Sequence, residues 1–546
     1  MFLIKIIFFY LLLLLSYFSI SGYGKKLTIF FDHNHNKNVS ESFFYGLLVI
    51  IPLSVLKVTL LNTNLVASIF ILIIGIIFFF KYFKIKDFYK DTVILLLLFL
   101  GLLISKTHED FYYYHLQYLR EINNEFYVLG IAVADIKYIY GSSIAYLQSI
   151  FVINENYNFI HIPIFLFFSS SVIFFLREIF NKKNNDLEIF YSIFICILLL
   201  VKFKRISEFG YDYIYHFLFF FVFYSFFLKN NKNLFFLSSF FIILIFIKNT
   251  AFLLFPFYIL FLLKNYLNFE SLRKFNFLKL FILTSLCLIF IINIFFKSGC
   301  ILIPSKITCL NKNIPWTVNY KESNFKTAIS WAKGYYHQNE NFKIASEDEF
   351  NKNFKWTKNW FSNHFKNKIS EYLFLLLFLK ILILILNFNL KAKKNLQDKK
   401  KIIFLFFTSL ISLCLWFSIM PQFRFGISQI TLVFFFPLYL ISYKYFNFRK
   451  ISRVVLLLIF SISIYNFSNL YRINKELLRE DLYKFSNFPY VNIRSIQHKK
   501  KQTENFYYFY ADKSDCINSK PICSTKEIDV KKVNKLIILS NKNMLQ

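Results

Sequence analysis

Residues 92–122 read TVILLLLFLGLLISKTHEDFYYYHLQYLREI, and the character of this stretch changes abruptly at its centre. The first part, residues 92–105, carries no charge, whereas residues 106–122 are crowded with titratable and aromatic side chains. An uncharged run of this kind is typical of a helix in the hydrocarbon core of a membrane. Charged side chains at its boundary are costly unless water, a partner or a ligand stabilises them. The stretch therefore predicts a membrane helix that ends in a loop rich in reactive groups.

The rest of the chain repeats the apolar half of this pattern. The 546 residues are 57% hydrophobic and 22% aromatic, with a mean hydropathy of +0.48, which excludes a disordered chain and is not typical of a soluble domain. A transmembrane β-barrel would alternate apolar and polar residues instead. We therefore predict an all-α integral membrane protein, a polytopic bundle of about 13–14 transmembrane helices, because the many apolar runs are long enough to cross a bilayer. The predicted spans are 2–20, 43–61, 65–80, 92–105, 158–176, 187–201, 212–228, 234–247, 250–263, 277–296, 371–387, 402–418, 427–443 and 452–466.

The formal net charge of +33 could indicate a nucleic-acid partner, but no nucleic-acid recognition motif accompanies it. Much of the excess lysine lies in short loops between spans, where positive charge sets the orientation of the helices. We therefore predict no nucleic-acid partner. Placing residues 81–90 in the cytoplasm puts the other strongly basic loops there too, namely 177–186, 229–233, 264–276, 387–401 and 444–453.

The opposite, extracytoplasmic side then receives the loop from residue 106 and the other candidate site loops. This assignment requires that Ser142–Ile153 not cross the membrane, and the segment is short enough to lie in the interface. Met1–Ile20 resembles a signal anchor with its N-terminus outside. The predicted divisions are N-terminal helices 1–91, a core 92–296 with an acidic outer loop 106–157, an outer lobe 297–370, C-terminal helices 371–466 and an outer tail 467–546.

The loop after residue 105 holds the first candidate site. Tyr114 and His115 follow Asp110 by about one helical turn, and Arg120 lies further along the same stretch. A carboxylate close to histidine and arginine could act as a general base or a metal ligand. The alternative is a solvated juxtamembrane helix with interfacial tyrosines.

Three further features lie on the same predicted side. The segment KFKRISEFGYD at 202–212 places Lys204 and Arg205 before Asp212, against the positive-inside trend, and such cations suit a phosphate-bearing ligand or form a chance basic loop. Lys248 interrupts a long apolar run and could contact a ligand or simply reach the interface. Arg424, in MPQFRFG at 420–426, could be functional or anchor a turn.

Cysteines and missing motifs narrow the chemistry. Cys300 and Cys309 share one predicted outer loop, and Cys516 and Cys523 share the outer tail, so both pairs suit disulfides on an oxidising side. The sequence contains no glycine-rich phosphate loop, no zinc-spaced cluster and no serine-hydrolase elbow. A soluble nucleotide-sugar transferase domain and an ATP-driven transporter are therefore not indicated.

These residues resemble a family of large, uncharacterised bacterial multi-pass membrane proteins, which in turn look like GT-C-type glycosyltransferases. The family pattern has Asp, then Tyr-His, then a Gly-Leu-Ala-Asn-Leu-His-Gly-Arg-like stretch ending in Ser-Ser. The matching positions here are Asp110, Tyr114, His115, Gly130, Ile131, Ala132, Ser142 and Ser143, with Val133, Asp135 and Lys137 where the pattern has Asn, His and Arg. Further matches are Ser207 and Asp212 in RISEFGYD, SGCILIPS at 298–305, IPWTV at 314–318, PQFRF at 421–425, and Cys516 and Cys523, with Ile517 replacing a Trp.

The resemblance implies an inverting glycosyltransferase of the bacterial inner membrane, with its active face extracytoplasmic. It would transfer a sugar from a polyprenyl-phosphate donor to an envelope glycan or lipid-linked acceptor, among membrane lipids. Asp110 would activate the acceptor hydroxyl or hold a divalent cation as a cofactor. Asp212 would be a second carboxylate of the site. His115 and Arg120 would orient the acceptor. The remaining expected substrate-binding residues are Glu109, Tyr114, Lys137, Lys204, Arg205, Lys248 and Arg424, the last four neutralising the leaving phosphate.

Three other functions fit parts of the same pattern. A transporter or flippase for lipid-linked oligosaccharide would need a polar path through the bundle, whereas the charged residues inside the spans are few and gather on one predicted side. An O-antigen-type polymerase or ligase would share the outer-face chemistry and differ in its acceptor. A scaffold without enzymatic activity is the third alternative.

Overall fold

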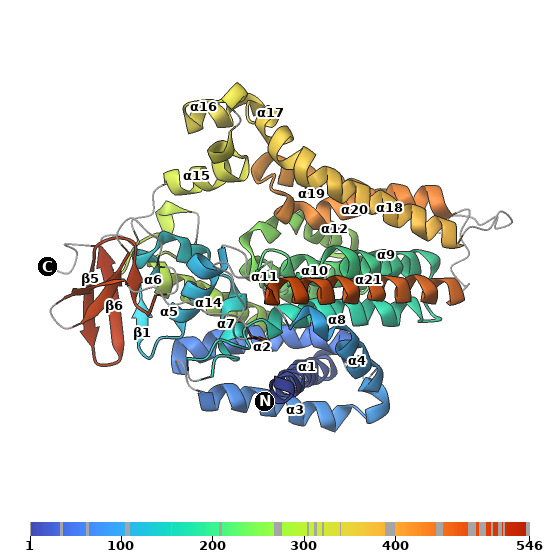
Figure 1. Ribbon diagram of the computed structural model, residues 1–546, viewed down its shortest axis with the longest axis horizontal. Coiled ribbons are helices and arrows are strands. Elements are labelled where there is room, and N and C mark those ends of the chain that lie inside the picture. Colours follow the sequence, from blue (N-terminus) through green and yellow to red (C-terminus); the bar gives the residue numbers. More distant parts are fainter. Residues whose placement is uncertain are drawn as a thin grey trace.

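Helices dominate the computed structural model (Figure 1), which describes residues 2–541 apart from a set of short segments. Those segments are 33–35, 62–64, 104–109, 154, 207–209, 267–275, 303–304, 311–313, 319–321, 339, 388–398, 444–450, 479–487, 491–497, 504–505, 512–515 and 517–518. Every predicted span overlaps a helix. The helices are α1 (Phe2–Asp32), α2 (Val39–Leu61), α3 (Leu65–Tyr82), α4 (Ile85–Leu98), α8 (Ile162–Ile179), α9 (Asp186–Lys202), α10 (Ile214–Val222) continued by η5 (Phe223–Leu228), α11 (Leu234–Ile247), η6 (Asn249–Leu254), α12 (Phe255–Tyr266), α14 (Phe277–Ser298), α18 (Ser370–Asn387), α19 (Lys399–Ile419), α20 (Phe423–Ser442) and α21 (Ile451–Leu477).

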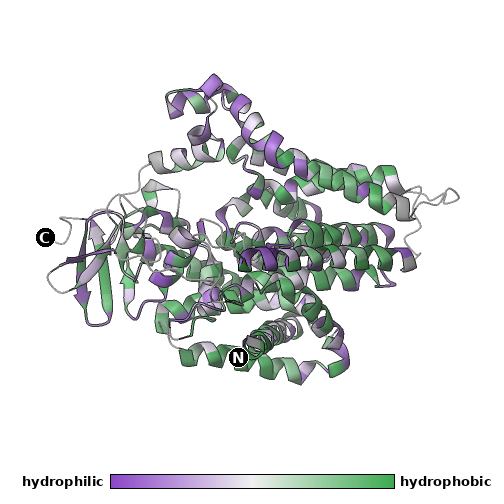
Figure 2. Ribbon diagram, viewed as in Figure 1, coloured by the Kyte–Doolittle hydropathy of each residue, from purple (hydrophilic) through white to green (hydrophobic). Residues whose placement is uncertain are grey.

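Eight helices of the described part are long and apolar enough to cross a membrane: α1, α2, α3, α8, α14, α19, α20 and α21. Hydrophobic residues run along these helices in Figure 2, whereas polar residues gather in the short helices and the strands beyond them. The prediction of an all-α, polytopic membrane bundle is therefore confirmed. The total of about 13–14 crossings stays a prediction, because helices such as α10 and α11 are shorter than a full span.

The interior of the bundle is built around α8, which is buried along nearly its whole length. Helices α2, α9 and α10 pack against it. Helices α1 and α2 approach each other closely at glycines, since a Cβ atom on Gly24 or Gly46 would collide with the backbone of the facing helix. Small residues allow this backbone contact, which is a common way for helices to associate in membranes.

The N-terminal helix is longer than the sequence predicted. The predicted span ends at Ile20, but α1 continues to Asp32. The ammonium of Lys25 is buried and donates to the carbonyl of Lys37, 2.7 Å away, while Lys26 faces outward. The two charges are thus accommodated within the helix and do not end it. In the same way α21 extends well beyond its predicted end, to Leu477.

The predicted outer loop 106–157 folds into short elements at one end of the bundle. They are η2 (Phe111–His115), α5 (Leu116–Ile122), β1 (Tyr127–Leu129), α6 (Ile131–Ala134), η3 (Ile136–Tyr140) and α7 (Ser143–Ser149). Helix α7 is far too short to cross a membrane, as predicted for Ser142–Ile153. The hydroxyl of Ser142 donates to the carbonyl of Ile247, 2.6 Å away, and so holds the start of α7 against the end of α11.

The predicted lobe 297–370 contains α15 (Glu322–Ala332), α16 (Glu347–Asn351), α17 (Thr357–Trp360) and η11 (Phe361–Ile369), at the upper left of Figure 1. Trp356 and Trp360 are buried against Phe417 of α19. The Trp360 indole also donates to the carbonyl of Pro421, 2.6 Å away, directly before α20. These contacts fix the lobe over the end of the bundle that carries the outer loop.

The C-terminal tail contains strands that the sequence analysis did not predict. They are β2 (Lys499–Gln502), β3 (Tyr507–Tyr510), β4 (Cys523–Ser524), β5 (Ile528–Val533) and β6 (Leu536–Asn541). Together with β1 of the outer loop they form two three-stranded sheets, with strand orders β2-β3-β4 and β1-β6-β5. Strand β1 pairs in parallel with β6, with Tyr127 opposite Leu536. Part of the second sheet thus comes from the loop that precedes α6, a pairing between distant segments that no local sequence pattern reveals.

The tail docks on α5 through a disulfide-closed loop. Cys516 bonds to Cys523, one of the two cysteine pairs named from the sequence; the other, Cys300–Cys309, closes a loop after α14. The Glu121 carboxyl accepts from the backbone N–H of Cys523 and from Gln117, each at 2.9 Å. Arg120 donates to the carbonyl of Ser519, 3.0 Å away. The last residues of α5 therefore form the polar surface to which the tail binds.

The Glu121 carboxyl should make this docking depend on pH. Burial raises the pKa of Glu121 to about 8, although the N–H groups of Cys523 and Gln117 oppose this shift. Because the docked state retains a proton that a solvated glutamate loses near its ordinary pKa, docking should weaken as pH rises from about 4.5 to about 8 and stay weak above that.

We expect Glu121→Gln to remove most of this pH dependence, because an amide can keep the hydrogen bond to Cys523 without acquiring a charge. Limited proteolysis of the purified protein between pH 6 and pH 9 measures it through the rate of cleavage in the tail. The cleavage rate of the wild type should increase with pH more than that of the variant. A detached tail domain or a disulfide-reduced sample defines the cleavage rate of a fully released tail. Equal profiles for the two proteins would contradict a docking role for this carboxyl.

Candidate functional site

One large cavity lies at the end of the bundle where the outer loop, the lobe and several helix ends meet. Its volume is about 1710 Å³. Polar side chains from η2, the turn before α10, the end of α11 and the start of α20 line one part of it, and apolar side chains of α2, α8, α11 and α14 line another. A pocket that combines a few convergent polar groups with apolar walls is the usual form of a small-molecule or lipid site.

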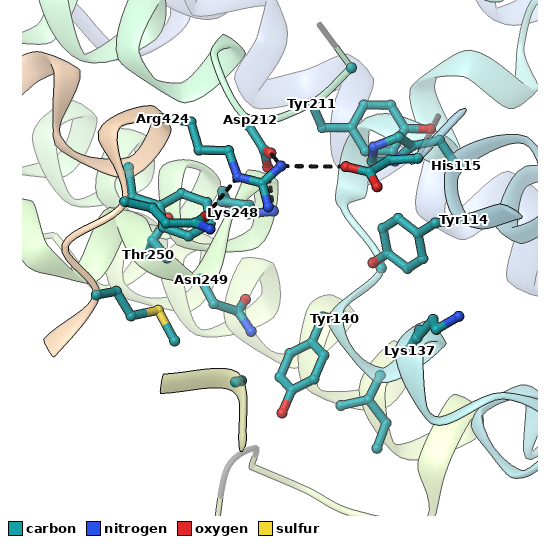
Figure 3. Close-up of a pocket in the computed structure, with 18 of the residues that line it drawn as sticks. Tyr114, His115, Lys137, Tyr140, Tyr211, Asp212, Lys248, Asn249, Thr250 and Arg424 are labelled. Carbon is teal, nitrogen blue, oxygen red and sulfur yellow. Dashed lines mark hydrogen bonds and ion pairs between the residues drawn. The ribbon is translucent and has the colours of Figure 1, made fainter. Parts of the chain in front are cut away.

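Two carboxylates and two cations form the polar centre of this cavity (Figure 3). The Arg424 guanidinium lies 2.8 Å from the Asp212 carboxylate and 3.4 Å from that of Asp110. The Lys248 ammonium forms a close ion pair with the other oxygen of Asp212. We call these four residues, Asp110, Asp212, Lys248 and Arg424, the ion cluster. Asp110 and Arg424, which are 314 positions apart in the sequence, are thus in contact with each other.

Helix ends explain how the chain brings the ion cluster together. Arg424 lies in the first turn of α20, and its carbonyl oxygen lies 2.9 Å from Nε2 of His216 in α10. The Tyr215 hydroxyl donates to the carbonyl of Phe425, 2.9 Å away. These bonds hold the start of α20 against the start of α10, directly after Asp212. Lys248 caps α11 in an extended conformation, so its side chain leaves the helix axis toward the same place.

The surroundings fix the charge of Asp212. Burial alone would raise the pKa of this carboxyl, but Arg424 and Lys248 outweigh burial and hold the pKa below its ordinary value. Asp212 is therefore ionised throughout the physiological range. Its side chain is only 7% exposed, whereas that of Asp110 is 38% exposed. Asp212 is thus the buried anchor of the ion cluster, and Asp110 is its accessible carboxylate.

His115 lies beside the ion cluster as a neutral ring. Burial lowers the pKa of His115 to about 4. Its ring packs edge-on against Tyr211, 4.2 Å between centroids, and against Gly210, where an added Cβ would lie 2.9 Å from Nε2. Gly210 has φ +66°, a conformation that favours glycine. Tyr114 lines the cavity next to this ring.

Lys137 lies across the cavity from the ion cluster, close to Tyr140 (Figure 3). Its ammonium is 3.9 Å from the Asp135 carboxylate, which also accepts from the Lys137 backbone N–H at 2.9 Å. The Lys137 side chain is 43% exposed. The cation expected from the family pattern is therefore at the cavity, in contact with a carboxylate of its own.

Three expected site residues lie elsewhere. Arg120 donates to the carbonyl of Ser519 in the tail and lies over the Tyr157 ring, and it does not line the cavity. Lys204 donates to Ser468 of α21, 3.2 Å away, and Arg205 is exposed. Neither lines the cavity, because α9 ends before them and the chain turns outward. Glu109 and Ser207 are outside the described residues.

The cavity also contains residues that sequence reasoning did not select. Lys202, the last residue of α9, lines it in place of Lys204 and Arg205. Trp331 of the lobe stacks on Arg424, with 5.0 Å from the guanidinium carbon to the ring centroid. Lys297, at the end of α14, also lines the cavity. An isolated lysine that closes an apolar run was the available signal for Lys297, the same signal that selected Lys248.

The ion cluster does not fit a bound divalent cation. The two Asp212 oxygens face Lys248 and Arg424, and the Asp110 carboxylate faces Arg424 as well. A metal ion at this place would have to displace these cations from their carboxylates. The described part of the chain contains no group of three or more His, Cys, Asp or Glu side chains that could hold a metal. The expectation that Asp110 holds a cation is therefore not supported by its donor set.

The fold and this cavity define a polytopic α-helical membrane protein with a polar site at one end of its bundle. Residues 1–431 match the family model described as a domain of unknown function, DUF8201, and the chain belongs to this family. No curated protein and no solved structure matches the chain. The match includes every residue of the ion cluster and ends within α20, before α21 and the tail.

We expect Asp212→Asn to lower the free energy of unfolding by about 3–5 kcal/mol, because it leaves two partly buried cations without their shared carboxylate. Asp110→Asn is the matched control. It removes one charge from a more exposed position and should cost less than about 1 kcal/mol. Thermal unfolding of both variants in the same detergent measures the difference. Equal losses for the two variants would show that Asp212 is not the anchor of the ion cluster.

Proposed function

We propose that this protein is a GT-C-type glycosyltransferase that transfers a sugar from a polyprenyl-phosphate donor to an envelope glycan or a lipid-linked acceptor. The observation that carries the proposal is the cavity itself, in which an accessible carboxylate and several cations adjoin apolar walls. A donor of this class needs both environments, since its sugar phosphate is polar and its prenyl chain is apolar. In a bacterial inner membrane, the positive-inside pattern of the loops would place this cavity on the extracytoplasmic face.

The apolar walls suit the lipid part of such a donor. Phe246 of α11 stacks on Phe290 of α14, 4.1 Å between ring centroids, and both side chains line the cavity. Ile291 and Ile294 continue this wall along α14, while the other face of α14 is largely exposed. A lipid could therefore reach the cavity from the membrane next to α14 without passing through the polar centre.

The polar groups suit an inverting displacement. Asp110 would accept the proton of the acceptor hydroxyl as its oxygen bonds to the anomeric carbon. The bond between that carbon and the phosphate oxygen breaks, and the phosphate leaves with the electron pair. Positive side chains of the cavity would stabilise the charge that develops on the leaving group. Asp212, firmly ionised and paired, would hold Arg424 and Lys248 in place and would be a poor proton acceptor.

A flippase is the main alternative, and the packing of the bundle favours transfer over transport. Between the cavity and the opposite end, α8, α9 and α10 are packed with buried aromatic side chains such as Phe174, Tyr191 and Phe217. At the opposite end, the pocket lined by Glu178 and Lys229 has a volume of only about 160 Å³, and its charges are paired with each other. This arrangement offers a lipid headgroup little polar surface along the way. A polymerase or ligase would use the same cavity with another acceptor.

We expect purified protein to transfer a labelled sugar from a polyprenyl phosphate to an envelope glycan acceptor. Asp110→Asn should reduce the rate by about 10²-fold or more, the usual contribution of a general base. Asp348→Asn, in an exposed position of the lobe, is the matched control and should retain the wild-type rate. Transfer that survives Asp110→Asn unchanged would remove the assigned base. Translocation of a fluorescent lipid-linked sugar in proteoliposomes, without transfer, would favour the flippase.

A further inference from the structure

The charges of the ion cluster cancel, which leaves the cavity without a free cation at that place. Arg424 and Lys248 are matched by Asp212 and Asp110. A phosphate that approached them would have to compete with carboxylates already in place. A better anion site would be a cation of the cavity that has no carboxylate beside it, and Lys297 is such a residue.

Lys297 is buried among hydroxyl groups and aromatic rings. The residue is 7% exposed, and its ammonium donates to the Tyr118 hydroxyl, 2.7 Å away. The ammonium also lies over the rings of Tyr118 and Tyr146, 5.3 Å from each centroid. Among the described residues, no carboxylate forms an ion pair with it.

The hydrogen bonds around Lys297 all run in one direction. The Tyr118 hydroxyl donates to the Tyr146 hydroxyl, 3.1 Å away, which donates to the amide oxygen of Asn293, 3.0 Å away. Each tyrosine proton is thus used, so Tyr118 can only accept from Lys297. Of the N–H groups of Lys297, only one is bonded within the described part of the chain.

A charged ammonium that is buried without a counter-ion destabilises a protein by several kcal/mol. The π faces of two tyrosines offset only part of that cost. Lys297, Tyr146 and Asn293 all line the cavity, so the remaining N–H groups are accessible from it. An anionic group bound there would supply the missing charge.

The surrounding surface identifies the kind of anion. Along α14, the cavity-lining residues Phe290, Ile291 and Ile294 lead away from Lys297 toward the middle of the helix. On the outer side of the same helix, Phe281, Leu288 and Ile292 are about half exposed, as for a helix in contact with lipid. An anion on Lys297 would therefore have an apolar groove extending from it into the membrane.

We propose that Lys297, with Tyr146 and Asn293, forms an anion subsite that binds the phosphate headgroup of a lipid whose chain lies along α14. The subsite is separate from the ion cluster, and it assigns phosphate recognition to a residue outside the expected set. The inference rests on the proposed function for the identity of the lipid as a polyprenyl phosphate. Its binding chemistry can be tested without turnover.

Binding of farnesyl phosphate to the full-length protein in detergent tests the subsite, with farnesol and inorganic phosphate as probes of the chain and the headgroup alone. The wild-type protein should bind farnesyl phosphate more tightly than either.

Lys297→Met keeps the length of the side chain but removes its charge, and it should weaken farnesyl phosphate binding at least about tenfold, the usual worth of a charged hydrogen bond. Lys297→Arg should retain much of the affinity. Lys366→Met removes an exposed lysine of η11 that does not line the cavity, and it should leave affinity within about twofold, as for a solvated charge.

A thermal unfolding experiment distinguishes a binding role from a structural one. Without ligand, Lys297→Met should melt at the same temperature as the wild type or higher, because it removes an uncompensated buried charge. With farnesyl phosphate, only the wild type and Lys297→Arg should gain stability. A lower melting temperature of Lys297→Met without ligand, together with unchanged affinity, would overturn the subsite.

The outcomes separate the subsite from the proposed function. Equal affinity of the wild type for farnesyl phosphate and farnesol would contradict phosphate recognition and the proposed donor together. A wild-type preference for the phosphate that persists in Lys297→Met would overturn the subsite alone. Tight binding of inorganic phosphate without a contribution from the chain would assign the subsite to a free anion and overturn the lipid.

Discussion

The buried carboxylate of Asp212 is the contact on which the arrangement of the cavity depends. It lies in the turn before α10 and pairs with Lys248 at the end of α11 and Arg424 at the start of α20. Arg424 then reaches Asp110, at the start of η2. Four segments of the chain are thus joined at their ends by charges that are costly to separate in a region of low dielectric. The apolar packing around α8 brings these helices together, and the ion cluster determines which of their ends meet.

The balance of charge in this cluster has a chemical consequence. A carboxylate held between two cations is stabilised as an anion and accepts protons poorly, so Asp212 suits positioning better than acid–base chemistry. Asp110 makes a longer contact with Arg424 and is more exposed, which makes it the better candidate for a proton acceptor. In turn the cations of the cluster are already neutralised. Lys297 contacts Tyr118 and Tyr146, and no carboxylate of the described residues forms an ion pair with it, so it is the better placed to receive an anion.

The sequence was informative where burial of a charge leaves a local signal. Uncharged runs located the long apolar helices, and Asp110, His115, Lys248 and Arg424 were selected because each follows or interrupts such a run. The same reasoning failed for Lys204 and Arg205, since it could not tell where α9 ends and thus which of three neighbouring cations faces the cavity. It also missed the strands of the tail. Strand β6 pairs with β1 some 400 residues earlier in the chain, and such a pairing is decided by tertiary packing.

The position of the tail links the sheets to the site. The family match ends at residue 431, so the complete ion cluster lies inside it, whereas the tail lies outside it. Yet the tail is not remote from the cavity. Its disulfide-closed loop binds the last residues of α5, and α5 follows η2 without a break, which means that His115 and Tyr118 belong to the same continuous helical segment as Arg120 and Glu121. A shift of the docked loop would move this segment and would change the position of His115 beside the ion cluster and of Tyr118 beside Lys297. The tail is therefore placed to hold both polar parts of the cavity in position, although none of its described residues lines the cavity.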